Sequence, residues 1–95
     1  MHESHICVLR GTEEFKMVSP IFREQIYAGV DERLYEMDTP VDFFNILYEI
    51  YPFAKEARII TATLDAGDCI YIPAYYFVQS KTIAKDGIDE TIMIN

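Results

Sequence analysis

Residues 66–79 place two apolar runs on either side of a proline corner. A Gly-Asp turn leads into the run Cys69–Ile72, Pro73 ends that run, and a second apolar run begins at Phe77. A Gly-Asp pair favours a turn, and proline lacks the N–H group that a central strand donates. The pattern therefore predicts two strands joined by a sharp bend, and it favours a fold made mainly of β-strands.

Similar runs of β-branched and aromatic residues, bounded by turn residues, recur along the whole chain. The first two runs flank a polar turn, which predicts that they pair with each other as a hairpin. In all, the pattern predicts six strands, at residues 6–9, 15–18, 59–64, 69–72, 77–83 and 91–94.

One short helix is predicted in the middle of the chain. Thr39 is a suitable N-cap and Pro40 suits the first helical position. Apolar residues then recur at helical spacing and stop before residues 51–52. The segment ahead of this helix reads as irregular, and its tyrosines Tyr27 and Tyr35 are expected to cover a sheet edge.

Length and composition limit the classes of function. A chain of 95 residues forms one domain at most, and its 51% hydrophobic residues are typical of a globular protein. The net charge of −8 argues against nucleic acid or an anionic membrane as a partner, because both attract basic surfaces. No apolar run approaches the ~20 residues that span a bilayer, and no secretory signal pattern opens the chain.

The two cysteines, Cys7 and Cys69, both lie in apolar strand runs. Two cysteines do not make a disulfide framework, so we expect buried, reduced thiols that react slowly. This interpretation implies an intracellular protein, in the cytoplasm or another reducing compartment. The alternative is a zinc site that combines both cysteines with His2 and His5, but the spacings match no zinc-finger or zinc-ribbon pattern.

Residues 67–78 closely resemble the G-D-x-x-Y-I-P-x-x-W/Y-x-H segment of the JmjC hydroxylases, cupin-like enzymes that use Fe(II) and 2-oxoglutarate. Further segments match the same family in the same order. Residues 10–20 resemble its G-x-K-x-F-x-L-x-x-P hairpin, 26–29 its L-Y-P segment, and 40–43 with 51–52 its S-x-V-D…Y-P stretch. The resemblance covers almost the whole chain and implies a mainly β fold, a partial double-stranded β-helix (jelly roll) with one short helix.

The resemblance also implies that the chemical positions of the family have changed here. The family holds iron with a His-x-Asp pair and a distal histidine five residues after the proline, and that last position is Val78. The His-x-Asp pair would fall just before Met1, and residues 2–4 imitate it at the wrong spacing. The family lysine that binds the far carboxylate of 2-oxoglutarate corresponds to Glu13, which would repel that carboxylate, and an asparagine corresponds to Ser4. We therefore expect no catalytic, metal-binding or cofactor-binding residue and no cofactor.

Other side chains offer weak substitutes for the lost ligands. Gln79 follows Val78, but adjacent strand residues face opposite sides, so its side chain should point away from the barrel interior. His2 and His5 lie near the first strand and are expected to be solvated, as are the paired carboxylates of residues 13–14 in their polar turn. The candidate pocket-lining residues are Tyr71, Tyr75 and Tyr76, for which a core position is the alternative.

The number of strands raises a question of completeness. A closed jelly roll needs about eight strands, and the sequence predicts six. We therefore interpret residues 1–95 as the C-terminal portion of a cupin/JmjC-like domain that belongs to a longer chain or is completed by a partner. The strand that contains Ile6 and Val8 is expected to pair with a segment from outside this sequence.

The residues favour a non-catalytic cupin/JmjC-like domain that serves as a structural or protein-interaction module in a larger protein or assembly. The alternatives are a fragment of a hydroxylase dependent on Fe(II) and 2-oxoglutarate, and a metal-free cupin that binds a small molecule. Bound iron would favour the first alternative, and saturable binding of a small molecule without metal would favour the second.

Overall fold

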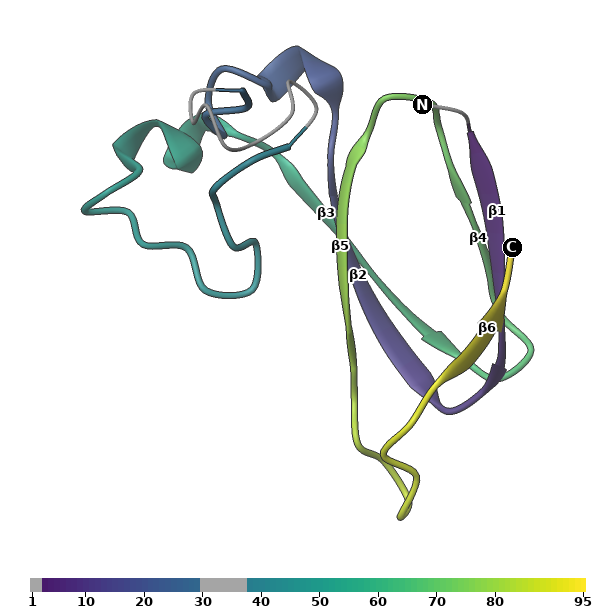
Figure 1. Ribbon diagram of the computed structural model, residues 1–95. Coiled ribbons are helices and arrows are strands. Elements are labelled where there is room, and N and C mark those ends of the chain that lie inside the picture. Colours follow the sequence, from purple (N-terminus) through teal and green to yellow (C-terminus); the bar gives the residue numbers. More distant parts are fainter. Residues whose placement is uncertain (1–2, 30–37) are drawn as a thin grey trace. The chain divides into compact units, whose positions relative to one another are not determined.

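The computed structural model describes residues 3–29 and 38–95, and in that part of the chain it is built mainly of β-strands (Figure 1). This confirms the predicted fold class. His2, a candidate zinc ligand, and Tyr35, which was expected to cover a sheet edge, lie outside the described residues. The strands are β1 (Ser4–Arg10), β2 (Thr12–Val18), β3 (Ile59–Asp65), β4 (Cys69–Ile72), β5 (Phe77–Thr82) and β6 (Ile92–Ile94), and the short 3-10 helices are η1 (Pro20–Phe22) and η2 (Pro52–Glu56).

The strands form two sheets of three, in the orders β4-β1-β6 and β3-β2-β5. The predicted hairpin between the first two strands is therefore wrong, because β1 and β2 belong to different sheets. Only Gly11 separates them, whereas a hairpin needs a loop of two or more residues. Gly11 has φ +85°, and a Cβ atom there would lie 2.2 Å from the carbonyl oxygen of Glu90. A glycine is thus required where the chain passes from one sheet to the other.

The expectation that the first strand pairs with a segment from outside this sequence is also wrong. β1 is the central strand of its sheet, with β4 antiparallel on one side and β6 antiparallel on the other. Ile6 lies opposite Ile70 in β4, and Val8 lies opposite Met93 in β6. β6 pairs with the edge of β1 at which a partner segment was expected. Local sequence patterns do not indicate this pairing.

The predicted helix after Pro40 is replaced by turns. The side chain of Gln79 binds the backbone groups that such a helix would use internally. Its Oε1 accepts a hydrogen bond from the N–H of Phe43 at 2.7 Å, and its Nε2 donates to the carbonyl oxygen of Val41 at 2.8 Å. Thr39 does act as a cap, because its Oγ1 accepts a hydrogen bond from the N–H of Val41 at 3.1 Å. A contact distant in sequence has overridden the local helix signal.

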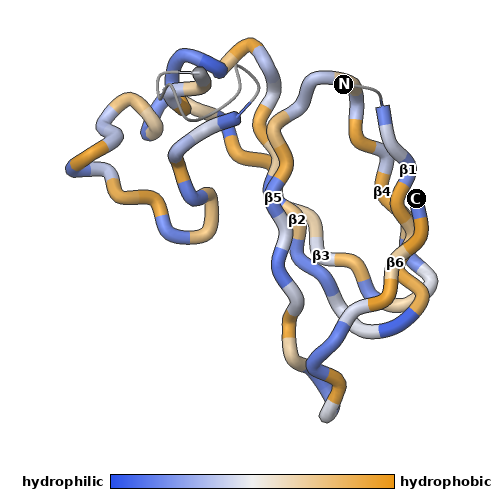
Figure 2. Tube along the Cα trace, in the orientation of Figure 1, coloured by the Kyte–Doolittle hydropathy of each residue, from blue (hydrophilic) through white to orange (hydrophobic). Residues whose placement is uncertain are grey.

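The chain divides into two compact units, each with its own buried side chains. Unit 1 comprises Met1–Phe15, Thr61–Ala74 and Ser80–Asn95, and unit 2 comprises Lys16–Ile60 and Tyr75–Gln79. Apolar residues recur along the strands of unit 1, as the hydropathy colours along β4 and β6 show (Figure 2). The buried hydrophobic residues of unit 1 are Val8, Phe15, Leu64 and Ile72, and those of the main cluster in unit 2 are Val18, Ile26, Val41, Phe43 and Phe77.

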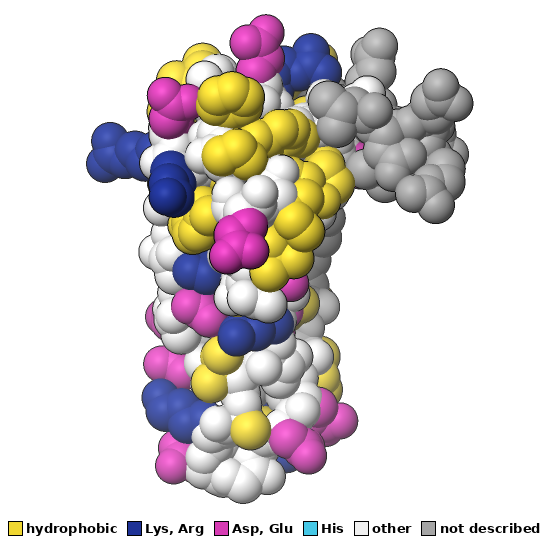
Figure 3. Space-filling model, turned by 90° about the vertical axis from the view of Figure 1, so that its left-hand side faces the viewer, with side chains coloured by type: hydrophobic (Ala, Val, Ile, Leu, Met, Phe, Trp, Pro, Cys, Tyr) yellow, Lys and Arg dark blue, Asp and Glu magenta, His cyan; other side chains and the backbone are white. Residues whose placement is uncertain are grey.

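Unit 2 also exposes apolar side chains to solvent. Figure 3 shows hydrophobic side chains gathered on the upper part of one face. Tyr27 does not belong to this exposed set, since it is half-buried against the main cluster and its ring lies 5.2 Å from that of Tyr51. The large apolar residues of unit 2 that are exposed include Ile21, Leu47, Tyr48, Ile50 and Phe53.

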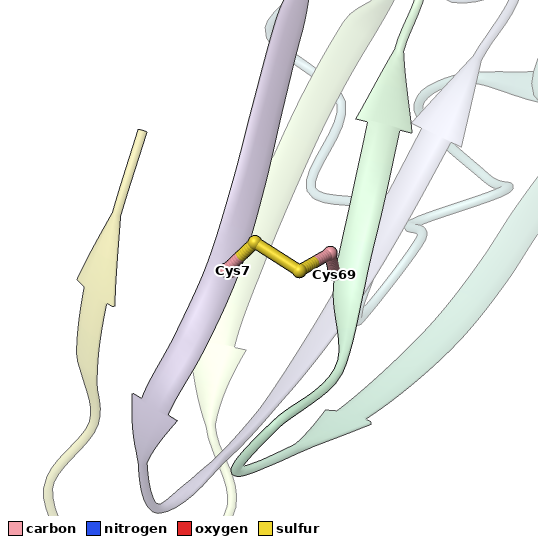
Figure 4. Close-up of a disulfide and its surroundings, with 2 residues drawn as sticks. All are labelled: Cys7 and Cys69. Carbon is pink, nitrogen blue, oxygen red and sulfur yellow. A yellow bond between two sulfur atoms is a disulfide. The ribbon is translucent and has the colours of Figure 1, made fainter.

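Cys7 and Cys69 form a disulfide between β1 and β4, which corrects the expectation of two reduced thiols (Figure 4). The two residues lie directly opposite each other in the antiparallel register, and their Cα atoms are 4.0 Å apart. Neither alternation nor spacing in the sequence reveals that register. The argument for a reducing compartment from free thiols therefore loses its basis, and so does the zinc site.

Candidate functional site

Glu13 lies in β2 and is buried, with 5% of its surface exposed. Its Oε1 accepts a hydrogen bond from Oγ1 of Thr82 in β5 at 2.9 Å. Neighbouring Thr12 points to the opposite face of the strand, because its Oγ1 donates to Oδ1 of Asp65 at 2.8 Å. Phe15 alternates with Glu14 and so shares the face of Glu13. A carboxylate thus occupies the buried face of unit 1, where the resemblance places a lysine.

Val78 lies in β5 between two residues that face the core of unit 2. Phe77 packs in the cluster with Val41 and Phe43, and Gln79 binds the backbone of the same two residues. Since adjacent strand residues face opposite sides, Val78 points to the other face of the strand. Gln79 points away from that face, as alternation predicts, and both ends of its amide are engaged by backbone groups. The position of the distal ligand therefore holds an aliphatic side chain, and its neighbour offers no substitute.

Ser4 begins β1, where it is half-buried opposite Ile72. The next residue, His5, is exposed and faces the opposite side of the strand. Its ring lies 4.9 Å from that of Tyr71, the residue opposite it in β4. Ser4 therefore shares the face of buried Val8, whereas His5 is directed outward.

Tyr71 is 48% exposed, and its hydroxyl donates a hydrogen bond to Oε2 of Glu3 at 2.6 Å. The hydrogen bond to this carboxylate raises the pKa of Tyr71, because ionisation would remove the donor. Beyond the proline corner, Tyr75 is 54% exposed and has the left-handed φ of 69°, while Tyr76 is half-buried. These positions place two of the three candidate pocket tyrosines in contact with solvent.

Among the described residues, Tyr71, Tyr75 and Tyr76 do not line any of the following cavities. One of about 270 Å³ lies at the turns of unit 1 and contains the Thr12–Asp65 pair. Lys85 Nζ lies 3.4 Å from the same Asp65 oxygen. The hydrogen bond from Thr12, and then the contact with Lys85, lower the pKa of Asp65. No local pattern in the sequence indicates that Thr12 and Lys85 meet Asp65.

The other two cavities lie in unit 2. One of about 300 Å³ is lined by Glu24, Gln25, Phe53 and Glu56, and one of about 470 Å³ is lined by residues 46–50. Both open beside exposed apolar side chains, Phe53 in the first and Leu47 with Ile50 in the second. The described residues that line them include no Lys or Arg.

No group of three or more His, Cys, Asp or Glu side chains in residues 3–29 and 38–95 is arranged to hold a metal ion. In the same ranges, no helix is long and apolar enough to cross a membrane. Taken separately, the positions that the resemblance assigns to iron and to 2-oxoglutarate hold an aliphatic side chain at Val78 and, at Glu13, a carboxylate that accepts the hydrogen bond of Thr82. An aliphatic side chain does not ligate Fe(II), and a carboxylate does not fit the carboxylate of 2-oxoglutarate.

Comparison with known proteins agrees with the fold. The model of the cupin-like domain family matches residues 1–95, the whole of this chain. A Dictyostelium discoideum protein described as JmjC domain-containing protein D is 26% identical over 80 residues, which cover 84% of this chain and 18% of that protein. The chain thus spans less than a fifth of the length of this curated relative. From the family match over its whole length, the chain belongs to the cupin-like domain family.

Proposed function

We propose that this cupin-like domain is non-catalytic and serves as a structural or protein-interaction module of a larger protein or assembly. The single observation that carries the proposal is the buried carboxylate of Glu13. It lies where an enzyme of the resembled type would need a cation to bind 2-oxoglutarate. The other residues at the family positions support the same conclusion.

The electrostatics at Glu13 oppose a dicarboxylate ligand. Like charges repel more strongly in a buried site than in water, because the interior screens them poorly. The partner of Glu13 is the neutral hydroxyl of Thr82, which does not offset the negative charge. An anionic cosubstrate at this position would meet an anion.

The edges of the two sheets support an interaction role. β4 and β6 are the outer strands of one described sheet, and β3 and β5 are those of the other. Outer strands leave backbone N–H and C=O groups unpaired, and proteins normally cover them. In this proposal, a protein partner or further strands of the same polypeptide pair with these edges, and residues 1–95 form the C-terminal portion of the domain.

An intracellular, cytoplasmic setting is part of the proposal. Disulfides that occur in the cytosol are usually transient or respond to redox conditions. The Cys7–Cys69 pair is compatible with that setting if the bond is opened and closed rather than permanent.

The test combines a binding assay with a turnover assay. Calorimetric titration of the protein with 2-oxoglutarate, in the presence of Fe(II) without oxygen, is expected to show no saturable heat. Succinate release in air with Fe(II) and ascorbate is expected to equal the blank without protein. Glu13→Gln is the matched variant, because it removes the charge and keeps an oxygen that can accept the hydrogen bond from the Thr82 hydroxyl. Turnover by the unaltered protein that depends on both iron and 2-oxoglutarate would contradict the proposal.

A further inference from the structure

The Cys7–Cys69 disulfide lies at a position of the β1–β4 ladder where the facing residues share no backbone hydrogen bonds. The neighbouring bond runs from the N–H of Val8 to the carbonyl oxygen of Asp68 at 2.9 Å. That pattern identifies Cys7 and Cys69 as a non-hydrogen-bonded pair, the type in which facing side chains lie closest. The bond therefore joins residues that the strand register already holds together, although 62 positions separate them in the sequence.

The strand that this bond secures is short and lies at a sheet edge. β4 has four residues, and among the described strands it pairs with β1 alone. Ile72 of β4 is buried, with 6% of its surface exposed, so that β4 covers part of the interior of unit 1. Apart from the backbone ladder, the side-chain contacts between β4 and β1 with its flanking Glu3 include the disulfide, the His5–Tyr71 ring contact and the Glu3–Tyr71 hydrogen bond.

The disulfide faces outward. Cys69 is exposed and Cys7 is half-buried, and the adjacent outward residue of β4, Tyr71, is 48% exposed. Thiol–disulfide exchange requires an attacking thiolate to reach one sulfur atom, and access is one of the conditions that set its rate. Cys69 is the more exposed residue of the pair.

We propose that the Cys7–Cys69 bond is a reversible redox switch that controls whether β4 stays on the edge of its sheet. A dithiol reductant supplies the two electrons. Its thiolate attacks Sγ of Cys69, the Cys7–Cys69 bond breaks, and Cys7 leaves as a thiolate that takes up a proton. The second thiol of the reductant, as its thiolate, then attacks the reductant sulfur of the mixed disulfide and releases Cys69, and the reductant becomes a disulfide.

Reduction leaves β4 held by its backbone ladder with β1, the contacts of Tyr71 and the packing of Ile72. Local opening of a short edge strand then becomes more frequent, while the rest of the molecule stays folded. Each opening uncovers the edge of β1 and the apolar side chain of Ile72, which are the features that an added strand from a partner would bind. Oxidation closes this edge. The inference does not depend on whether the domain is catalytic.

The experiment measures hydrogen exchange of backbone amides in the oxidised protein, in the same protein reduced with a dithiol, and in Cys7→Ser/Cys69→Ser. The expected result is exchange about tenfold or more faster for the amides of β4 in the reduced protein and in the variant. The amides of Phe15 and Leu64, in the other sheet, should stay more protected than those of β4 in the reduced protein and in the variant. Equal exchange in β4 across the three samples would overturn the proposal, as would a loss of protection at every amide, which indicates global unfolding.

Titration of thiols in the native protein provides the second measurement. The protein purified in air should give no free thiol, and after treatment with a dithiol it should give two. Removal of the dithiol followed by oxidation should restore the slow exchange of β4. Two free thiols before reduction, or a bond that a dithiol reduces only in denaturant, would overturn the switch.

Discussion

In unit 1, β1 meets β4 through a regular backbone ladder that a disulfide reinforces. In unit 2, residues 41–43 are held differently, because the side chain of Gln79 binds a backbone N–H and a backbone carbonyl oxygen of a segment without regular structure. The first region follows the alternation of its sequence, whereas the second contradicts a helix signal in its own sequence. Local patterns therefore locate the strands of the first region, and the helix signal of the second fails because a distant side chain takes the backbone groups.

The largest expected effect concerns the covalent link of unit 1. Cys7→Ser/Cys69→Ser should lower the free energy of unfolding by about 4 kcal/mol relative to the oxidised protein, from the loop entropy of a crosslink that closes a loop of roughly 60 residues. Denaturant unfolding of the oxidised protein and of the variant measures this difference. The reduced wild-type protein is the control and should match the variant. A loss below about 1 kcal/mol would mean that the backbone ladder alone fixes β4.

The corresponding change in unit 2 removes the amide of Gln79. Gln79→Ala should lower the free energy of unfolding by about 2 to 3 kcal/mol, because it leaves the N–H of Phe43 and the carbonyl oxygen of Val41 without the Gln79 amide. Gln79→Glu is the matched control, since it keeps an acceptor for Phe43 and loses the donor to Val41. Its expected cost lies between those of the wild type and the alanine variant. If residues 41–50 became helical in Gln79→Ala, as circular dichroism would detect, the override of the helix signal would be demonstrated directly.

Gly11 and Gly67 allow a paired test within unit 1. Both have positive φ, +85° and +97°, but only at Gly11 would a Cβ atom meet another part of the chain, at 2.2 Å from the Glu90 carbonyl oxygen. Gly67→Ala should cost about 1 to 2 kcal/mol, the strain of a left-handed alanine. Gly11→Ala should cost more than Gly67→Ala, because Glu90 must also move. Equal losses of unfolding free energy, measured by denaturant unfolding, would show that the backbone at Glu90 moves aside without a cost in free energy.

The smallest expected effect is the pH dependence at the turns of unit 1. The hydrogen bond from Thr12 and the contact with Lys85 place the pKa of Asp65 below its ordinary value of 3.8. The stabilisation from ionised Asp65 is therefore complete above that ordinary value and is lost as the pH falls through the lower pKa of the folded protein. Titration followed by NMR at the Asp65 carboxyl carbon should show this depressed pKa. Thr12→Val should raise it more than Lys85→Met does, and the reverse order would mean that charge dominates over hydrogen bonding.

The amino-acid sequence by itself determined the six strands, with ends within a few residues of those observed, and the family to which they belong. These features follow from alternation and from turn residues, which act over a few positions and require no knowledge of distant neighbours. Alternation also placed Gln79 on the opposite face of its strand from Val78, whereas the assignment of Ser4, Glu13 and Val78 to the family positions stays a prediction. Strand alternation is enough to place a side chain on one face or the other.

Only the tertiary structure decided which strands are neighbours. The place of β6 beside β1, the Cys7–Cys69 bond and the hold of Gln79 on Val41 and Phe43 join positions that are far apart in the sequence. Each results from a register or an approach of distant segments, and the free energy of such contacts is not encoded in any local run of residues. For this reason, two cysteines in apolar strands predict buried thiols from the sequence alone. Only the register of β1 and β4 shows that the two residues lie opposite each other.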